Sequence, residues 1–318
     1  MTLPALPRLG FIGAGRLARC VARRFARAGY PVAAIASRAP ASAQALADLI
    51  AAVAAPSAAP RCAALDTPQA VVDAADLIFL TVPDDELAPL AARLRFDPSR
   101  SHEQALVHCS GASGVALLDP AREQGAATGG FHPLYLFGGG DADLARIDGC
   151  SVTIEADGAL KDTLAALAAA LGCHPLSIPA GGRMLYHAAA HYAASFALCN
   201  LAECVELWRS LGFDEDDALR ALLPMLAGTI ETARDKGLAN ALAGPVSRGD
   251  ARIVEQQLAL LETRGGDHAA LYALLTRRAL MLARRRTPPP ASLDALERAV
   301  ENSLGRALPP GAPAREKP

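Results

Sequence analysis

Two glycines near the beginning of the chain could hold phosphate groups. Gly13 and Gly15 stand in the segment Leu9–Ala18, which reads LGFIGAGRLA, and Gly29 ends the helix expected after it. In such a strand-turn-helix unit the first glycine permits a tight turn, the second lets the backbone approach a pyrophosphate, and the small Ala18 allows close packing. The alternative is a glycine-rich turn without a ligand. The predicted contacts to a dinucleotide are Gly13, Ala14, Gly15, Arg16 and Leu17.

The end of the second expected strand distinguishes the two nicotinamide cofactors. A site for NAD places an acidic residue about twenty residues after the glycines, where it binds the ribose 2′-hydroxyl. This chain has Ser37 and Arg38 at that place. A guanidinium can hold a 2′-phosphate through two charge-assisted hydrogen bonds, so we expect NADP(H) rather than NAD(H). The alternative is that Arg38 is a solvated surface residue.

Three further strand ends carry groups that could line the same site, because open α/β sheets bind ligands at the carboxyl ends of their strands. Backbone at Val82 and Pro83 would line the nicotinamide ribose. Ser110 or His108 could hydrogen-bond the cofactor or the substrate, and His132 could take part in the chemistry. The competing interpretation of each polar residue is structural: a turn, a helix cap or a buried histidine.

One long apolar segment, Arg183–Leu211, carries His187 and His191 one helical turn apart. A histidine can give a proton to a carbonyl oxygen as hydride reaches the carbon, because its ordinary pKa near 6.5 is close to working pH. His187 is therefore the leading candidate for the general acid, and the alternative is a histidine satisfied within a helical bundle. The HxxxH spacing also suits zinc, but no HExxH pattern or third ligand accompanies it, so we predict no metal site.

A rigid turn is expected at Gly244–Asp250, which reads GPVSRGD. Arg248 could clamp a substrate carboxylate through two hydrogen bonds. In the structural alternative, Asp250 caps the next helix and Arg248 forms an ion pair within the bundle.

Hydrophobic periodicity indicates the elements that position these residues. Short apolar runs alternate with alanine-rich segments in the first half, which is typical of a parallel sheet covered on both faces. Strands are predicted at Leu9–Ile12, Val32–Ser37, Leu77–Val82, Ala105–Cys109, Gly129–His132, Ser151–Glu155 and Cys173–Ile178, with a weak one near Arg61–Ala63. After a linker at Pro179–Gly182 the period becomes 3.6 residues. Helices are predicted at Arg183–Leu211, Glu215–Lys236, Asp250–Arg264, Asp267–Arg284 and Ser292–Leu304.

The predicted fold is therefore α/β, with an N-terminal Rossmann domain (a doubly wound parallel sheet) followed by an all-α domain. We expect an NADP-binding domain at 1–180, a helical substrate and dimerisation domain at 181–306, and a disordered tail at 307–318.

Composition excludes several classes of protein. The chain of 318 residues is 52% hydrophobic and 20% charged, which is enough to bury the cores of two domains. A net charge of −2 gives no basic field for nucleic acid. The longest apolar stretch, Met184–Trp208, is interrupted by charged and polar residues, so no membrane span is predicted. Seven dispersed cysteines and the absence of a visible signal peptide favour a cytoplasmic protein with reduced thiols.

The motifs together resemble a known family. These motifs are the N-terminal GxGxxA and the segments His108–Gly111, Phe131–Leu134, Tyr186–Ala190 and Ala243–Asp250. The chain resembles Rossmann-like proteins with a C-terminal helical domain of unknown function, within the 6-phosphogluconate dehydrogenase and pyrroline-5-carboxylate reductase superfamily. The resemblance implies NADP-linked reduction of a small substrate and a homodimer formed through the helical domain. Some relatives resemble an alternative class of ketopantoate reductase.

The chain also departs from that superfamily. Related β-hydroxyacid dehydrogenases carry GxGxxxKxxxN before and along the long helix, with lysine as acid or base. Here Arg183 replaces the second glycine, and His187 and His191 stand at the lysine and asparagine positions. Further departures from the family's usual residues are Ser195, Thr232 and Gln257.

Three interpretations follow. The first is an NADP-dependent reductase of a small carbonyl or imine acid, such as a 2-oxo acid, with His187 or His132 as proton donor. The second is a catalytically degenerate NADP-binding sensor dimer, which the missing lysine favours. The third is a Rossmann enzyme of another chemistry.

Overall fold

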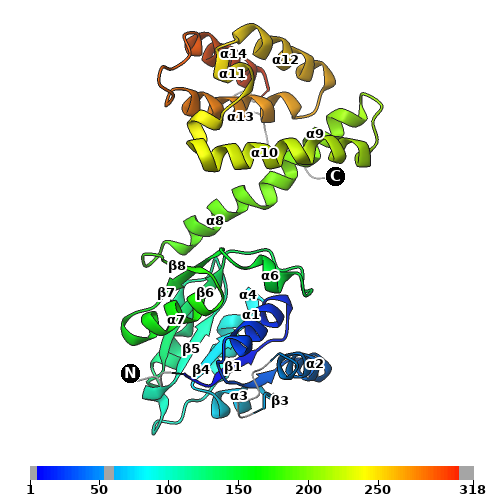
Figure 1. Cartoon of the computed structure of the whole chain (residues 1–318). Coiled ribbons are helices and arrows are strands. Elements are labelled where there is room, and N and C mark those ends of the chain that lie inside the picture. The colour runs from blue at the N-terminus through cyan, green and yellow to red at the C-terminus, as the bar shows by residue number, and fades with distance from the viewer. Residues whose placement is uncertain (1–5, 54–60, 308–318) are drawn as a thin grey trace. The chain divides into compact units, whose positions relative to one another are not determined.

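An eight-stranded sheet forms the core of the first part of the chain (Figure 1). The computed structural model describes residues 6–53 and 61–307, and the chain divides into two units after Ala194. The strands are β1 (Leu9–Ile12), β2 (Val32–Ala36), β3 (Ala63–Leu65), β4 (Leu77–Leu80), β5 (Ala105–His108), β6 (Ala127–Pro133), β7 (Ser151–Glu155) and β8 (His174–Ser177).

The sheet has the strand order β3-β2-β1-β4-β5-β6-β7-β8. Neighbouring strands are parallel except β6 and β7, so that β7 and β8 run opposite to the other six. The order reverses at β1, and open sheets bind ligands outside the carboxyl ends of their strands at such a point. The predicted doubly wound sheet is confirmed, with the two reversed strands at one edge.

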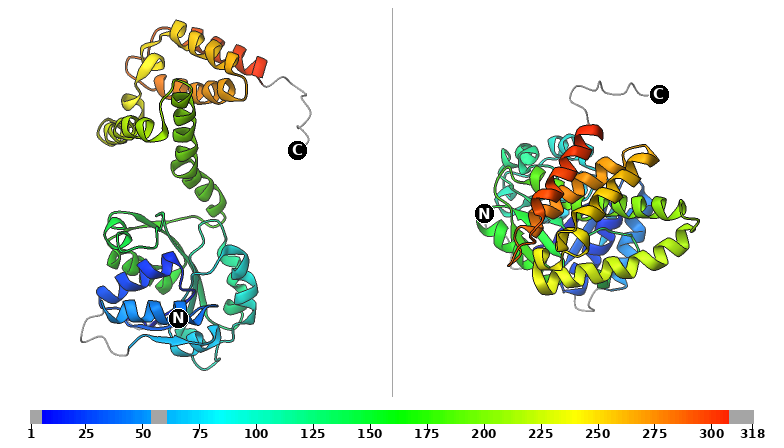
Figure 2. Two further views of the ribbon diagram at one scale, coloured as in Figure 1. Left: turned by 90° about the vertical axis from the view of Figure 1, so that its right-hand side faces the viewer. Right: turned by 90° about the horizontal axis from the view of Figure 1, so that it is seen from above.

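Helices lie on both sides of the sheet, as the left view of Figure 2 shows. Successive residues of a strand point to opposite faces, so Phe11 belongs to one buried cluster and Ile12 to the other. The helices of this unit are α1 (Arg16–Arg27), α2 (Pro40–Ala51), α3 (Pro68–Ala74), α4 (Asp84–Arg93), α5 (Asp119–Arg122), α6 (Asp143–Arg146), α7 (Gly158–Ala170) and α8 (Arg183–Ala193).

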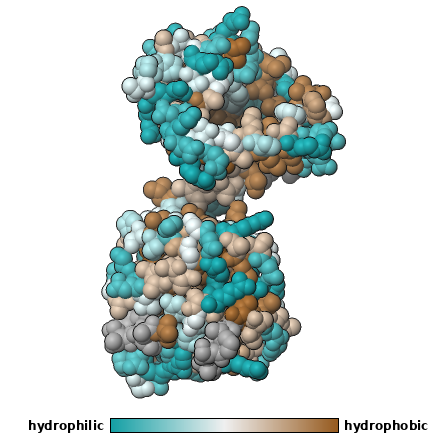
Figure 3. Space-filling view, viewed as in Figure 1, coloured by the Kyte–Doolittle hydropathy of each residue, from teal (hydrophilic) through white to brown (hydrophobic). Residues whose placement is uncertain are grey.

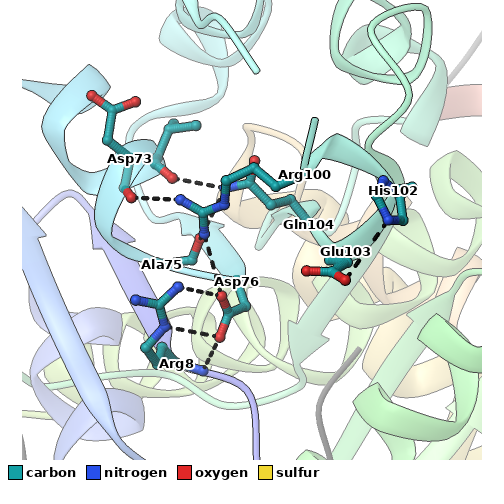
Figure 4. A network of polar contacts seen from close by, with 9 residues as sticks. Arg8, Asp73, Ala75, Asp76, Arg100, His102, Glu103 and Gln104 are labelled. Atoms are coloured by element: carbon teal, nitrogen blue, oxygen red, sulfur yellow. Dashed lines mark hydrogen bonds and ion pairs between the residues drawn. The ribbon is translucent and has the colours of Figure 1, made fainter. Parts of the chain in front are cut away.

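A polar network ties together the amino ends of three neighbouring strands (Figure 4). The Asp76 carboxylate, just before β4, accepts hydrogen bonds from the backbone and side chain of Arg8, just before β1, at 2.6–3.1 Å. Gln104, just before β5, donates to the carbonyls of Val72 and Ala75. Burial alone would raise the pKa of Asp76, but the bonds from Arg8 lower it overall. This end of the sheet is therefore closed, and the opposite end remains for ligands.

The second unit consists of helices. They are α9 (Ser195–Arg209), α10 (Glu215–Ala241), α11 (Gly244–Arg248), α12 (Ala251–Arg264), α13 (His268–Ala283) and α14 (Leu293–Ala307). Its main core joins α12, α13 and α14, with Val254, Leu280 and Val300 at 0–2% exposure. The predicted helical region after the sheet is confirmed.

Three predicted elements differ in detail. The helix expected over Arg183–Leu211 is interrupted, because Ala194 has φ −113° and ψ −83° and separates α8 from α9. The helix predicted over Glu215–Lys236 ends at a kink, because Gly237 has a φ of +73° and is not helical, and a further helical turn follows it to Ala241 within α10. Of the tail predicted at 307–318, only Ala307 lies within the described residues, where it ends α14.

Candidate functional site

A pocket of about 410 Å³ lies at the carboxyl ends of β1, β2 and β4. It brings together most of the predicted cofactor contacts, namely Gly13, Ala14, Gly15, Ser37, Arg38, Val82 and Pro83. The predicted contacts Arg16 and Leu17 begin α1 beside it and do not line it, and neither does Ser110. The glycine loop, the end of β2 and the end of β4 therefore meet at one pocket.

The glycine loop is shaped for a close approach. Gly13 has φ +114°, and a Cβ there would lie 2.7 Å from the backbone carbon of Thr81. The Thr81 hydroxyl donates to the Gly13 carbonyl at 2.9 Å, which fixes the loop against the end of β4. At Gly15 a Cβ would meet nothing within 4 Å, and α1 begins there without a side-chain cap. The first amides of α1 are thus left for an anion, as a pyrophosphate requires.

Arginine is present where the cofactor's 2′ position is expected. The Arg38 side chain is 85% exposed, and its guanidinium lies 3.5 Å from the Glu86 carboxylate. An exposed pair of this kind contributes little stability, so Arg38 can exchange partners. Arg93 of α4 lines the same pocket together with Asp66. Arg93 was not predicted from the sequence, because nothing in the pattern of α4 indicates that this side chain reaches the end of β2.

A second cluster surrounds Gly111, in the loop after β5. A Cβ on Gly111 would lie 2.8 Å from the Cδ2 atom of His187 and 2.9 Å from the Nε2 atom of His132. His132 comes from β6 and His187 from α8. Both predicted candidates for the proton donor therefore lie next to Gly111, which has no side chain. The His191 ring packs edge-to-face on that of His187, with centroids 4.8 Å apart.

Two histidines at this edge of the sheet, His132 and His108, are held neutral. His132 is bonded through Nδ1 to the Tyr186 hydroxyl at 3.0 Å. Burial and then the Arg183 charge lower the pKa of His132 to about 4. His108 is fully buried, and burial is also the main cause that lowers its pKa to about 3. At pH 7 both rings are therefore uncharged.

These lowered pKa values give a prediction for stability. Between pH 6.5 and 5 the unfolded chain protonates His108 and His132, whereas the folded chain, with pKa values of about 3 and 4, does not. Their stabilising effect is complete above pH 6.5 and is lost as the pH falls. At about 1.4 kcal/mol per pH unit for each ring, we expect the two rings together to cost about 4 kcal/mol by pH 5. Amide hydrogen exchange in β4 and β5 measures this loss.

The matched variant for this measurement is His108→Asn. It removes one of the two titrating rings and should make the slope of unfolding free energy against pH about half as steep. A slope that is the same in both proteins would show that His108 titrates normally in the folded state.

Arg183 connects α8 to the sheet. His108, Gly130 and Glu155 lie side by side on β5, β6 and β7. The Arg183 side chain, 2% exposed, lies over Gly130, forms an ion pair with Glu155 and donates to the Ser110 carbonyl at 2.8 Å. This role of Arg183 was not predicted from the sequence. The one available indication was that an arginine stands at a position where relatives have glycine.

The Ser110 hydroxyl is already engaged within the protein. It donates to the Asp84 carboxylate at 2.8 Å and accepts from the amides of Ala112 and Ser113 at 3.2 and 3.0 Å. These bonds form a turn, which is the structural role considered above. A contact from Ser110 to substrate stays a prediction.

In the second unit, Arg248 ends α11 and is exposed, with no ion-pair or hydrogen-bond partner within residues 6–53 and 61–307. Asp250 caps α12 by accepting from the Ile253 amide at 3.2 Å, which confirms the capping part of the structural alternative. The carboxylate clamp at Arg248 stays a prediction.

Neither a metal-binding cluster nor a membrane-spanning helix occurs among residues 6–53 and 61–307. No cluster of three or more His, Cys, Asp or Glu side chains in this part of the chain could hold a metal ion. None of the helices built from these residues has the length and apolar character needed to cross a membrane.

Two family models match the chain. The first, a Rossmann-like domain, matches residues 3–133. The second, a domain of unknown function (DUF2520), matches residues 150–279. No curated protein sequence matches.

Solved structures share the fold. A protein from Thermotoga maritima is 22% identical, with a TM-score of 0.67 over 87% of this chain and 100% of that chain. A reductive aminase from Aspergillus terreus in complex with NADPH and ethyl-5-oxohexanoate is 17% identical, with a TM-score of 0.62 over 92% and 99%. An imine reductase from Myxococcus stipitatus in complex with NADP+ is 18% identical, with a TM-score of 0.61 over 95% and 100%.

Proposed function

Since the chain joins a Rossmann-like domain to a DUF2520 domain, we propose that it is an NADP(H)-dependent reductase of a small carbonyl or imine acid. The observation that carries the proposal is the pairing of His132 and His187 at Gly111, beside the carboxyl ends of the strands that form the dinucleotide pocket. Similar folds solved with NADPH or NADP+ support it.

The residues of the pocket fit a dinucleotide. Gly13, Gly15 and the uncapped start of α1 would hold the pyrophosphate, and Ser37 with Arg38 would hold the 2′-phosphate. When bound, NADPH supplies hydride.

The other groups act on the substrate. His187 or His132 would serve the oxygen or nitrogen that gains a proton, and Arg248 would hold the substrate's carboxylate. A 2-oxo acid such as ketopantoate has both groups in one small molecule.

The test is oxidation of NADPH, followed by absorbance, with a panel of 2-oxo acids and cyclic imines. Turnover of at least one member is expected. Tight NADPH binding without turnover of any member would instead favour the sensor dimer. A specific observation favours that second candidate: histidines occupy the positions of the catalytic lysine and asparagine of related dehydrogenases.

Arg38→Ala is expected to lower NADPH affinity about ten- to a hundredfold and to leave NADH affinity nearly unchanged. The reason is the loss of charge-assisted bonds to the 2′-phosphate, each worth about 1.5–3 kcal/mol. Calorimetric titration with both cofactors measures the change. Arg234→Ala, which removes an equally charged exposed side chain in the second unit, should change neither affinity. Equal affinity of the wild type for the two cofactors would refute the preference.

We also propose a homodimer formed through the helical unit. Leu223, Leu226 and Ile230 form one stripe along α10 and are 48%, 39% and 54% exposed. Apolar surface is also visible among the hydrophilic side chains of this unit in Figure 3. A second copy that covers the stripe would remove it from water.

Light scattering is therefore expected to give twice the chain mass at micromolar concentration. Ile230→Glu should shift the protein toward monomer, because it would bury a charge in the interface. Asp235→Ala, a change at a polar position of the same helix, should leave the dimer intact. A wild-type monomer at this concentration would contradict the proposal.

A cytoplasmic location is proposed from the cysteines, all seven of which are free. Burial raises the pKa of the Cys20 and Cys109 thiols to about 12, which makes both unreactive core residues.

A further inference from the structure

We propose that His132 acts as a neutral imidazole whose Nε2–H donates a hydrogen bond to the substrate's carbonyl oxygen, and that Tyr186 is the positioning residue that fixes this tautomer. The inference rests on the proposed reductase function. It gives the two histidines different tasks, in that His132 polarises the carbonyl group and His187 supplies the proton.

The contact between Tyr186 and His132 sets the tautomer in this proposal, because we assign the Tyr186 hydroxyl as the donor and Nδ1 as the acceptor. The Tyr186 hydroxyl lies 3.0 Å from Nδ1, and the two rings meet edge-to-face with centroids 5.8 Å apart. A neutral imidazole carries a single N–H, on one nitrogen or the other. When the phenol donates its proton to Nδ1, that nitrogen is the acceptor and the N–H is on Nε2. The hydroxyl bonded to Nδ1 thereby makes Nε2 the hydrogen-bond donor of the ring.

Nε2 faces a space that the chain keeps free. It has no hydrogen-bond partner among the described residues, and it points to the bare α-carbon of Gly111. A side chain there would lie 2.9 Å from Nε2 and 2.8 Å from the His187 ring. Glycine at this position therefore leaves the two rings open to the same small group.

The charges around His132 favour the neutral ring. Arg183 and His187 lower its pKa after burial, and Asp84 is the one group that raises it. The neighbouring ring of His108 is itself buried and neutral. With a pKa of about 4, only about one His132 in a thousand is an imidazolium at pH 7. A general acid so rarely protonated is ineffective, whereas a neutral N–H remains a good hydrogen-bond donor.

The proton and electron balance is complete without a change at His132. Hydride from NADPH adds to the carbonyl carbon, and the electron pair of the C=O π bond moves to oxygen. The Nε2–H bond stabilises the negative charge that develops there, in a buried setting where such bonds are strongest. The proton that completes the alcohol comes from His187, which water then reprotonates. His132 ends the cycle as the same tautomer.

The test uses the full chain labelled with ¹⁵N in its histidines. NMR at pH 7 reports which nitrogen of each ring carries hydrogen, and the His132 signals are identified by their loss in His132→Gln. We expect a protonated Nε2 and an unprotonated Nδ1, with no titration above pH 5. In Tyr186→Phe both tautomers should appear, and kcat should fall about tenfold or more while the Kd for NADPH stays the same. Tyr192→Phe, which removes another hydroxyl from α8, should leave tautomer and kcat unchanged.

Several results would overturn the inference. An Nδ1–H tautomer or an imidazolium at pH 7 in the wild type would exclude the proposed donor. An unaltered tautomer in Tyr186→Phe would exclude the positioning role. Because the NMR measurement needs no substrate, it is separate from the proposed function. If the expected tautomer is present but no carbonyl compound is reduced, the reductase proposal fails and with it the bond to substrate, while the Tyr186 contact stands.

Discussion

His187→Ala is expected to lower turnover about a hundred- to ten-thousandfold, which is the range for loss of a positioned general acid. The His187 ring lies beside Gly111, opposite His132, and not on the glycine loop that would hold the phosphates. The affinity for NADPH should therefore stay nearly constant. Steady-state kinetics on a substrate that the wild type reduces, with a separate cofactor titration, measures both quantities. The pH profile of turnover should lose one limb in the variant.

Two variants make this result interpretable. His174→Ala removes an exposed histidine from β8, away from the cluster, and should keep full turnover. His132→Ala should lower turnover as well, but without removing the limb from the pH profile, because its ring does not titrate near neutral pH. If His187→Ala and His132→Ala both retain full activity, neither ring serves the reaction. The proton would then have to come from water, Ser110 or Tyr186.

The sequence predicted those parts of the fold that local pattern encodes. The strands at Leu9–Ile12 and Ser151–Glu155 have the predicted bounds. The first is a short apolar run, and the second alternates polar and apolar residues, which are the two strand patterns that a sequence can show. The left-handed conformation of Gly13 follows equally from its place in GxGxxA. The break at Ala194 was not predictable in this way, because an alanine-rich segment has high helix propensity on both sides of it.

The contacts that assemble the histidine cluster at Gly111 could not be predicted from local sequence pattern. Tyr186 meets His132 across 54 positions of sequence, and Arg183 meets the Ser110 carbonyl across 73. No periodicity relates such residues, and their pairing depends on the order of strands in the sheet. Strand-end reasoning could place His132 at the edge of the sheet, but it could not show which residue would orient the ring. The sequence therefore predicted individual candidate residues for the site, but not the hydrogen bonds that connect them.

Gly130 is the position where that network is most easily broken. A Cβ on Gly130 would lie 2.6 Å from the Cζ atom of Arg183 and overlap its guanidinium. That group cannot move aside freely, because it is 2% exposed and bound to Glu155 and to the Ser110 carbonyl. In Gly130→Ala the guanidinium must leave these partners, which also displaces α8 with Tyr186.

Gly130→Ala is accordingly expected to destabilise the first unit by about 3 kcal/mol, the low end of the range for breaking a buried ion pair, since Glu155 keeps 18% exposure. Turnover should fall with it. Hydrogen exchange at the amides of β5 and β6 measures the stability change. Gly114→Ala is the matched control, because Gly114 has φ −76° and a Cβ there would meet nothing within 4 Å. It should be neutral or stabilising by up to about 1 kcal/mol. Equal hydrogen-exchange protection in Gly130→Ala and Gly114→Ala would mean that the Arg183 guanidinium does not occupy the space over β6. Contacts other than those of Arg183 would then have to hold α8 against the sheet.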